Sequence, residues 1–293
     1  MQLLVMLAIA LGLVLVSSII SAPLLLAGAS SRPVILVVQS ITQLLTFLVP
    51  VILMTVIYYR GSQKEFYRLD FSGRRWYMAL VAVVVTLLLM PAIDWLTTWN
   101  DSWNLGRVGE ILRNIQDQTE GLVEEMMATD TVAGLLGNLL VVALIPAVCE
   151  EVFFRAGIQN LLQRWLCGKK NNYQPSVDSC QLATHVAIWL TAIIFSLLHG
   201  EVFAFMPRLL LGALLGYLYV YGGSLLPNML AHFVNNAIVV VLYWLVARGV
   251  IDIDPAEPLG FGWPIIVSCT VAALFAGWVT FSRRDDDKKA LKV

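Results

Sequence analysis

The sequence predicts an all-α fold, a polytopic membrane bundle of about eight transmembrane helices with an amphipathic segment on its outer surface. Apolar residues make up 59% of the 293 residues and charged residues only 13%, whereas soluble domains have roughly 45–50% and about 25%. Long stretches also lack charge: none occurs before Arg32 or between Arg32 and Arg60, and a span needs about 20 apolar residues. This composition excludes a soluble or disordered chain. The net charge of −1 argues against nucleic acid as a partner, which would need a basic surface.

The first uncharged stretch contains two predicted spans, 3–28 and 34–58. Turn-forming residues from Ala29 to Pro33 separate them. The start of the chain does not have the pattern of a signal peptide, because Met1 and Gln2 supply no basic side chain.

Six further apolar runs predict the remaining spans. They lie near 76–94, 131–161, 181–206, 208–222, 225–247 and 262–282. Gly222, Gly223 and Pro227 divide the long run after Arg208 into two helices, because glycine and proline interrupt helices.

The segment 105–128 predicts an amphipathic helix that lies on the membrane surface. Its apolar residues recur at helical spacing among polar ones: Leu105, Val108, Ile111, Leu112 and Ile115. Three tryptophans just before it suit an interfacial aromatic belt: Trp95, Trp99 and Trp103.

Loop charges predict that both termini are cytoplasmic, because cytoplasmic loops carry an excess of Lys and Arg. Segment 60–75 and the tail after 282 are rich in these residues, and 164–180 adds three more. By contrast, 95–130 has two arginines against seven acidic residues. We expect an integral multi-pass protein of a bacterial inner membrane.

Ionisable side chains within the apolar runs are informative, because each costs about 2.5–3.5 kcal/mol at the centre of a spanning helix. Nineteen uncharged residues precede Glu150. Glu151 and Arg155 are four residues apart on one helical face, which favours an ion pair, whereas Glu150 lacks such a partner. A desolvated carboxyl without a partner is a candidate general base or acid. The alternative is that the helix has already emerged and Glu150 faces solvent.

Two histidines lie in other apolar runs. His199 follows an uncharged run that starts at 181, and Phe195 precedes it by one turn on the same face. His232 and Asn236 also share a face, with Asn235 beside them. Each of these groups alone could equally form packing contacts or interhelical hydrogen bonds.

The third histidine and two other nucleophiles are weaker candidates. We expect His185 near a cytoplasmic helix start, facing the interface. A thiol mechanism at Cys149 is disfavoured because buried cysteines are usually inert. A serine mechanism at Ser224 is disfavoured because this residue lies at a turn between spans.

Together the polar clusters provide the groups that peptide hydrolysis needs, because a base must activate water and donors must hold the developing oxyanion. Two histidines and a carboxylate could instead bind zinc with an open water position. The H-E-x-x-H motif of zincins does not occur. Both possibilities stay open on the residues alone.

The three motifs resemble those of the CPBP family, which comprises type II CAAX prenyl endopeptidases and bacteriocin-processing or self-immunity proteins. E-E-x-x-x-R occurs at Glu150, Glu151 and Arg155, F-x-x-x-H at Phe195 and His199, and H-x-x-x-N at His232 and Asn236. The resemblance covers roughly 130–247, and no motif position departs from the pattern.

The resemblance implies an intramembrane endopeptidase of eight helices. In it, Glu150 and His199 would activate water, and His232 and Asn236 would stabilise the oxyanion. Glu151 and Arg155 would support the site. We favour the version without a metal or other cofactor. If zinc is used, its expected ligands are Glu150, His199 and His232.

We expect one integral membrane domain with three parts. Residues 1–130 would hold three spans and the amphipathic segment, 131–247 the catalytic core, and 248–293 the last span and a charged cytoplasmic tail. The expected partners are the lipid bilayer and a membrane-associated peptide or protein substrate, such as a peptide leader. No residue pattern identifies a prenyl pocket.

Two other functions remain as alternatives. The chain could be a non-catalytic membrane immunity or scaffold protein, or a transporter that relays protons through Glu150 and the histidines. Transporters often contain repeats with matched broken helices, and the sequence shows none.

The predicted topology contains one conflict. A helix that starts at the cytoplasmic side near 181 would place His199 in the outer part of the membrane, whereas Glu150 would lie nearer the middle. The two can meet only if the helix before His199 dips into the membrane, or if the helix that carries Glu150 is long and tilted.

Overall fold

The computed structural model describes residues 1–26, 31–69, 74–168 and 180–258, with 260, 262, 265, 267–272, 274 and 275 beyond them. Every regular element within these residues is helical: α1 Gln2–Leu26, α2 Arg32–Gln43, η1 Leu44–Leu48, α3 Val49–Tyr58, α4 Gln63–Tyr67, α5 Arg74–Asp101, α6 Gly106–Met127, α7 Val132–Asn138, η2 Leu139–Leu144, α8 Ile145–Glu151, η3 Val152–Gln159, α9 Asn160–Leu166, α10 Gln181–Leu198, η4 Val202–Ala204, α11 Phe205–Gly222 and α12 Leu226–Ala247.

Seven helical stretches in the described residues are long and apolar enough to cross a membrane: Gln2–Ala22, Arg32–Tyr58, Met78–Asp101, Val132–Leu166, Gln181–Leu198, Val202–Gly222 and Leu226–Ala247. The predicted all-α polytopic bundle is therefore confirmed, and the first seven predicted spans each correspond to one of these stretches. The eighth predicted span, 262–282, lies largely outside the described residues, as does the charged tail.

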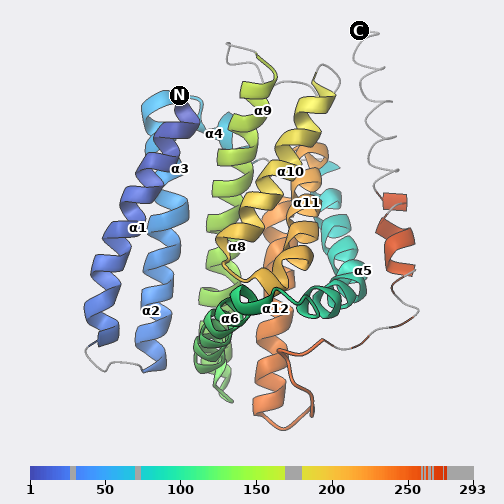
Figure 1. The fold of residues 1–293 in the computed structure, drawn as a ribbon. Helices are drawn as coiled ribbons and strands as arrows, with labels where there is room; N and C mark the ends of the chain where they lie inside the picture. Colours follow the sequence, from blue (N-terminus) through green and yellow to red (C-terminus); the bar gives the residue numbers. More distant parts are fainter. Residues whose placement is uncertain are drawn as a thin grey trace.

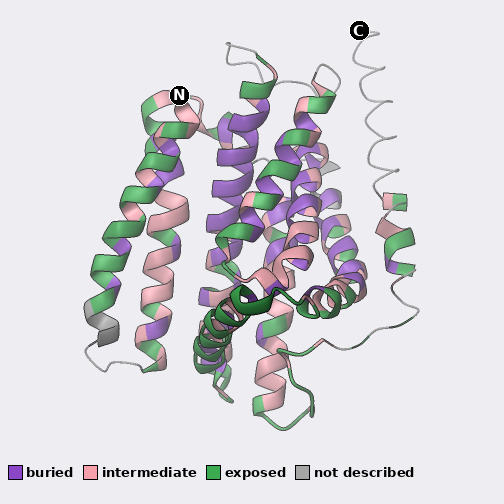
Figure 2. Cartoon of the chain, in the orientation of Figure 1, coloured by how far each residue is buried: buried purple, intermediate pink, exposed green. Residues whose placement is uncertain are grey.

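The bundle is arranged around the helical series α7–α9. In Figure 1, α1 and the α2–α3 series stand side by side at one edge, and α1 packs along α2, η1 and α3. At the other edge, α5 packs against α11 and α12, while α10 packs along α11. Figure 2 shows that burial is concentrated on α8, α9 and α11, whereas α1 and α6 are largely exposed.

The α7–α9 series forms one continuous helical stretch of 35 residues, Val132–Leu166. At 1.5 Å per residue it is about 52 Å long, more than a hydrocarbon core of about 30 Å requires. It contains two wider π-helical segments, η2 and η3, and η2 ends directly before Ile145-Pro146. Proline lacks an N–H and crowds the preceding turn, and a π segment accommodates this without ending the helix.

Helix α10 ends earlier than the sequence predicts, at Leu198 rather than near 206. Gly200 follows with a φ of 74°, a left-handed conformation that favours glycine and ends the helix. In Figure 1 the chain turns from α10 into α11 part-way down the bundle. The conflict over His199 is resolved because the end of α10 places His199 Nε2 4.0 Å from Glu150 Oε2.

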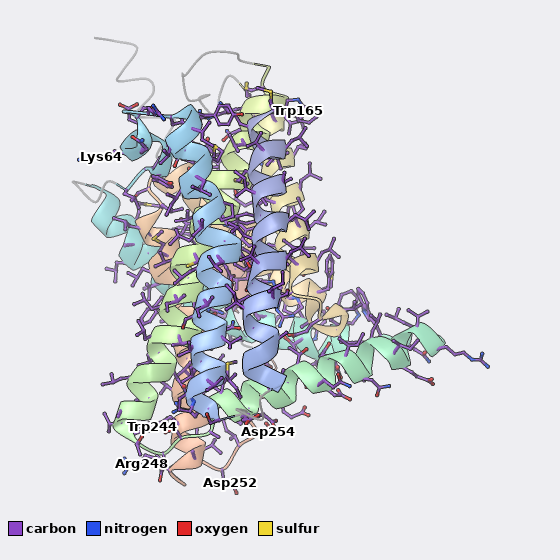
Figure 3. All side chains as sticks on the ribbon, turned by 90° about the vertical axis from the view of Figure 1, so that its left-hand side faces the viewer. Lys64, Trp165, Trp244, Arg248, Asp252 and Asp254 are labelled. Atoms are coloured by element: carbon purple, nitrogen blue, oxygen red, sulfur yellow. A yellow bond between two sulfur atoms is a disulfide. The ribbon has the colours of Figure 1, made fainter. Side chains whose placement is uncertain are left out.

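Helix α6 confirms the predicted amphipathic segment. It lies across the bundle rather than along it, and Figure 3 shows that it extends sideways beyond the other helices. The Arg32 guanidinium connects the C-terminal end of α6 to α7. Its Nε donates to the carbonyl of Met126 in α6 at 2.9 Å, and its Nη2 donates to Asn138 Oδ1 in α7 at 2.7 Å. The exposed apolar side chains of α6 include Val108 and Ile111, which suits contact with lipid.

Candidate active site

Glu150 lies at the centre of the bundle, in α8. Its side chain is only 7% exposed, and Gln43 Nε2 at the end of α2 donates to Oε1 at 3.2 Å. The other oxygen, Oε2, is buried and has no hydrogen-bond partner among the described residues. Two imidazole nitrogens face this oxygen, His232 Nε2 at 3.9 Å and His199 Nε2 at 4.0 Å. The structure therefore brings together the three ionisable groups that the sequence placed in separate helices.

The hydrogen bond of His199 determines what its ring offers to Glu150. His199 caps the end of α10, and its Nδ1 lies 2.7 Å from the carbonyl oxygen of Phe195. Since a carbonyl only accepts, Nδ1 carries the proton, and Nε2 of the neutral ring has a free lone pair. Burial lowers the pKa of His199, the Glu150 carboxylate partly opposes this, and Arg208 adds to the lowering. The neutral ring presents a proton acceptor opposite Glu150.

His199 is more accessible than Glu150 and His232. Its side chain is 29% exposed, against 4% for His232. The residue lies in the turn after α10, beyond the end of that span. A substrate would therefore approach Glu150 from the side of His199.

Glu151 forms a second, fully buried network beside the first. Arg155 Nε donates to Glu151 Oε2 at 3.0 Å, and neither side chain is exposed. His232 Nδ1 lies 3.1 Å from Glu151 Oε1, and Asn228 Nδ2 donates to Oε2 at 3.4 Å. The predicted pair of Glu151 with Arg155 is present, and through His232 it is connected to the group that faces Glu150.

Phe195 packs among the polar groups and fixes their positions. Its ring centroid lies 4.7 Å from that of His199 and 6.1 Å from that of His232. The Arg155 guanidinium lies over the same ring at 5.4 Å. The aromatic residue of the second motif therefore serves as apolar packing between charged side chains.

Asn236 lies one turn beyond His232 in α12 and is bound to its neighbour. Asn235 Nδ2 donates to Asn236 Oδ1 at 3.2 Å. The amide nitrogen of Asn236 has no acceptor among the described residues, so it remains a free donor. Among the described residues, Asn236 forms no hydrogen bond with Glu150 or His199.

Sequence reasoning missed two members of the site, Gln43 and Asn228. Asn228 precedes His232 by four residues on the same face of α12, so the spacing N-x-x-x-H-x-x-x-N could have identified it. Gln43 comes from a span more than a hundred residues earlier. A glutamine within an apolar run has no spacing or motif that would assign it to the site. Its role emerges only from the packing of η1 and α2 against α8.

The weaker candidates have structural partners instead. Ser224 Oγ donates to the carbonyl of Arg68 at 3.0 Å, and His185 Nδ1 lies 2.9 Å from the Tyr217 hydroxyl. Cys149 is buried and free. Cys167 forms a disulfide with Cys180, which the spacing of the cysteines did not predict.

The three candidate zinc ligands do not form a preformed tetrahedral site. With zinc–ligand bonds of about 2.0–2.1 Å, two ligand atoms lie roughly 3.3 Å apart. The nitrogens of His199 and His232 lie 4.0 Å and 3.9 Å from Glu150 Oε2. Among the described residues, no group of three His, Cys, Asp or Glu side chains is close enough to hold a metal.

Comparison with known protein families agrees with this geometry. Residues 132–238 match the family model described as "Type II CAAX prenyl endopeptidase Rce1-like". No curated protein and no solved structure gave a match to the chain. The matched residues run from the start of α7 to the second half of α12 and include every residue of the three motifs. This segment of the chain is therefore similar to the Rce1-like type II CAAX prenyl endopeptidases, a family of membrane proteases, and the match agrees with the resemblance of the three motifs to the CPBP family.

Proposed function

We propose that this protein is an intramembrane endopeptidase that hydrolyses a peptide bond in a membrane-associated protein or peptide. The observation that carries the proposal is the buried Glu150 Oε2, which has no hydrogen-bond partner among the described residues and faces two imidazole nitrogens. An unpaired carboxylate oxygen in an apolar bundle is costly. A role in catalysis explains why this oxygen is kept there.

Glu150 and His199 activate the attacking water in this mechanism. The 4.0 Å between Glu150 Oε2 and His199 Nε2 is close to the span that one water bridges with two hydrogen bonds of about 2.8 Å. Both atoms accept protons, so the water donates a hydrogen to each and keeps its lone pairs for the carbonyl carbon. As the water oxygen bonds to that carbon, its proton passes to Glu150.

The oxyanion that forms is held by His232 and Asn236. Since Nδ1 of His232 donates to Glu151, Nε2 donates to the oxyanion when the ring is in its imidazolium form. Asn236 contributes its free amide N–H as the second donor. When the C–N bond breaks, Glu150 returns the proton to the leaving amine, which restores the starting state.

Glu151 and Arg155 support the site without touching the substrate. Arg155 neutralises Glu151, and Glu151 orients the ring of His232. The side chains themselves supply a base and two donors, so the proposed mechanism requires no metal or other cofactor. We propose a bacterial inner membrane as the location, with both termini in the cytoplasm.

The test is a comparison of peptide termini in membranes and medium from cells that express wild type, Glu150→Gln or His199→Ala at equal protein levels. We expect termini that appear with the wild type only, because either change removes a group that activates water, and a loss of about 10²–10⁴-fold in rate is typical. The same cleavage by the purified protein should continue in the presence of a zinc chelator.

Two results would contradict the proposal. Identical termini from all three strains, together with a phenotype that Glu150→Gln still rescues, would favour a non-catalytic immunity or scaffold role. Loss of cleavage on chelation, with recovery on addition of zinc, would favour the zinc-dependent protease.

Val250→Ala serves as the control substitution in the comparison of peptide termini, because this exposed side chain lies outside the helices of the site.

A further inference from the structure

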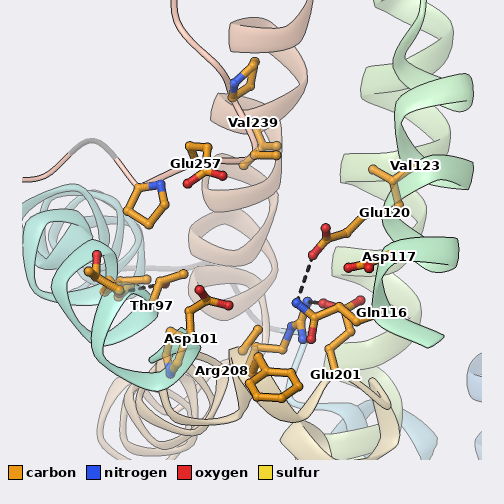
Figure 4. Close-up of a pocket in the computed structure, with 18 of the residues that line it drawn as sticks. Thr97, Asp101, Gln116, Asp117, Glu120, Val123, Glu201, Arg208, Val239 and Glu257 are labelled. Atoms are coloured by element: carbon orange, nitrogen blue, oxygen red, sulfur yellow. Dashed lines mark hydrogen bonds and ion pairs between the residues drawn. The ribbon is translucent and has the colours of Figure 1, made fainter. Parts of the chain in front are cut away.

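A cavity of about 780 Å³ lies next to the candidate active site. Its walls come from α5, α6, α11 and α12, with residues 255–258 and 260 across one side (Figure 4). Glu201 and Arg208 line it just after His199 in the chain, and Asn235 lines it next to Asn236. The size is in the usual range for ligand pockets, and the cavity is connected to the site through Asn235, whose Nδ2 donates to Asn236 Oδ1.

The cavity wall carries a surplus of negative charge. Five carboxylates line it, against the guanidinium groups of Arg113 and Arg208. Arg113 pairs with Asp101, and Arg208 pairs with Glu201. The other three carboxylates have no cationic partner among the described residues: Asp117, Glu120 and Glu257.

Gln116 gives independent evidence that this wall is built to meet a ligand. The residue is only 7% exposed and lines the cavity from α6. Its Nε2 donates to Glu120 Oε1 at 2.9 Å, which fixes the amide, and its Oε1 is buried without a partner among the described residues. A buried acceptor without a donor costs free energy, and a ligand N–H would satisfy it. Figure 4 shows Gln116, Asp117 and Glu120 on the same wall.

We infer that this cavity binds a basic segment of the substrate, with a Lys or Arg side chain placed among the unpaired carboxylates and next to Gln116. This inference rests on the proposed function, since it names the class of substrate. Ammonium and guanidinium groups donate only, which matches a wall of acceptors. The opposite face of α6 exposes Val108 and Ile111, so the cavity lies beside a surface suited to lipid, where a membrane-associated substrate can reach it.

The test measures binding separately from cleavage. The Glu150→Gln protein, in nanodiscs of zwitterionic phosphatidylcholine, is titrated into a short fluorescent peptide of alanine and serine with lysine at every third position. A second peptide has glutamate in place of lysine. Fluorescence anisotropy reports both affinities, and neutral lipid keeps the peptides from binding to the bilayer by charge.

The cavity variant carries Asp117→Asn and Glu257→Gln in addition. Its matched control carries Glu110→Gln and Glu125→Gln, two exposed acids of α6 that do not line the cavity. We expect the lysine peptide to bind more tightly than the glutamate peptide. We also expect the cavity variant to lose about tenfold in affinity for it, while the control changes less than about twofold. Equal melting temperatures of the cavity variant and its control verify that both fold.

Equal affinities for the two peptides, or equal losses in the cavity variant and its control, would overturn the inference. The outcome is separable from that of the proposed function. If the protein binds the lysine peptide selectively but cleaves nothing, only the proposed protease activity is contradicted. If a protein that retains Glu150 and carries Asp117→Asn and Glu257→Gln cleaves a basic substrate at the unaltered rate, only the inference about the cavity is contradicted.

Discussion

Glu150 and Glu151 are neighbours in the chain but have different surroundings. Successive helical residues point about 100° apart, so Glu151 faces Arg155, His232 and Asn228, while Glu150 faces Gln43 and the open side of the site. One carboxylate is fully paired and the other keeps an oxygen free. The difference separates a positioning residue from the candidate general base.

This contrast predicts that the two substitutions lower the stability by very different amounts. Glu151→Gln leaves the fully buried Arg155 guanidinium without a carboxylate, and breaking a buried pair typically costs about 3–5 kcal/mol. Glu150→Gln retains an oxygen that can accept from Gln43, so it should change the free energy of unfolding by less than about 1 kcal/mol. Thermal and denaturant unfolding of both proteins in the same detergent measures the difference.

The prediction fails if both substitutions lower stability to the same extent. In that case Glu150 would be a structural residue like Glu151. The activity assay gives the complementary measurement, since Glu150→Gln should be stable and inactive.

At the scale of elements, the position of His199 depends on how closely α10 packs against α11. Gly212 and Gly216 of α11 face α10, and a Cβ at Gly212 would lie 3.2 Å from the Cα of Ala192 and 3.3 Å from the ring of Phe195. Small residues spaced by four allow such close approach of membrane helices. The four-residue spacing of the two glycines can be seen in the sequence, but the sequence does not show that α10 is the helix that packs against them.

We expect Gly212→Val to push α10 away from α11 and to displace His199 from Glu150. Overpacking of this kind typically costs about 1–3 kcal/mol, and activity should fall together with thermal stability. Gly137→Val is the matched control, because a Cβ at Gly137 has no atom within 4 Å. Equal melting temperatures for the two variants would show that close packing of α10 against α11 does not determine the stability of the protein.

For the whole molecule, two features point to opposite orientations in the membrane. The surplus of Lys and Arg in 60–75 and 164–180 favours a cytoplasmic location for this end. Cys167 and Cys180 form a disulfide at the same end, and disulfides usually persist in oxidising compartments. Figure 3 shows Lys64 and Trp165 together at this end, and Arg248, Asp252 and Asp254 at the other.

Cysteine labelling in intact cells distinguishes the two orientations. In a background whose native cysteines are replaced by serine, we expect Asp252→Cys to react with a membrane-impermeant maleimide from outside. Lys64→Cys should react only after the membrane is permeabilised, because both side chains are exposed but lie at opposite ends of the bundle (Figure 3). The reverse pattern would place the disulfide end outside and would reverse the proposed topology.

The sequence alone determined the class of this protein, seven of its spans, the amphipathic helix and the pairing of Glu151 with Arg155. These properties depend on local quantities, namely hydropathy over about 20 residues and the helical spacing of side chains four apart. The resemblance to a known family could be read from the sequence for the same reason, since the motif residues lie within short segments of three helices.

Only the tertiary structure decided how these segments meet. It ended α10 at Leu198, brought Gln43 from the second span to Glu150, and left Glu150 Oε2 facing His199 and His232. It also placed unpaired carboxylates of α6 and of the segment after α12 in one cavity beside the site. Such contacts join residues more than a hundred positions apart in the sequence. The packing of whole helices sets their distances, and local patterns do not encode this packing.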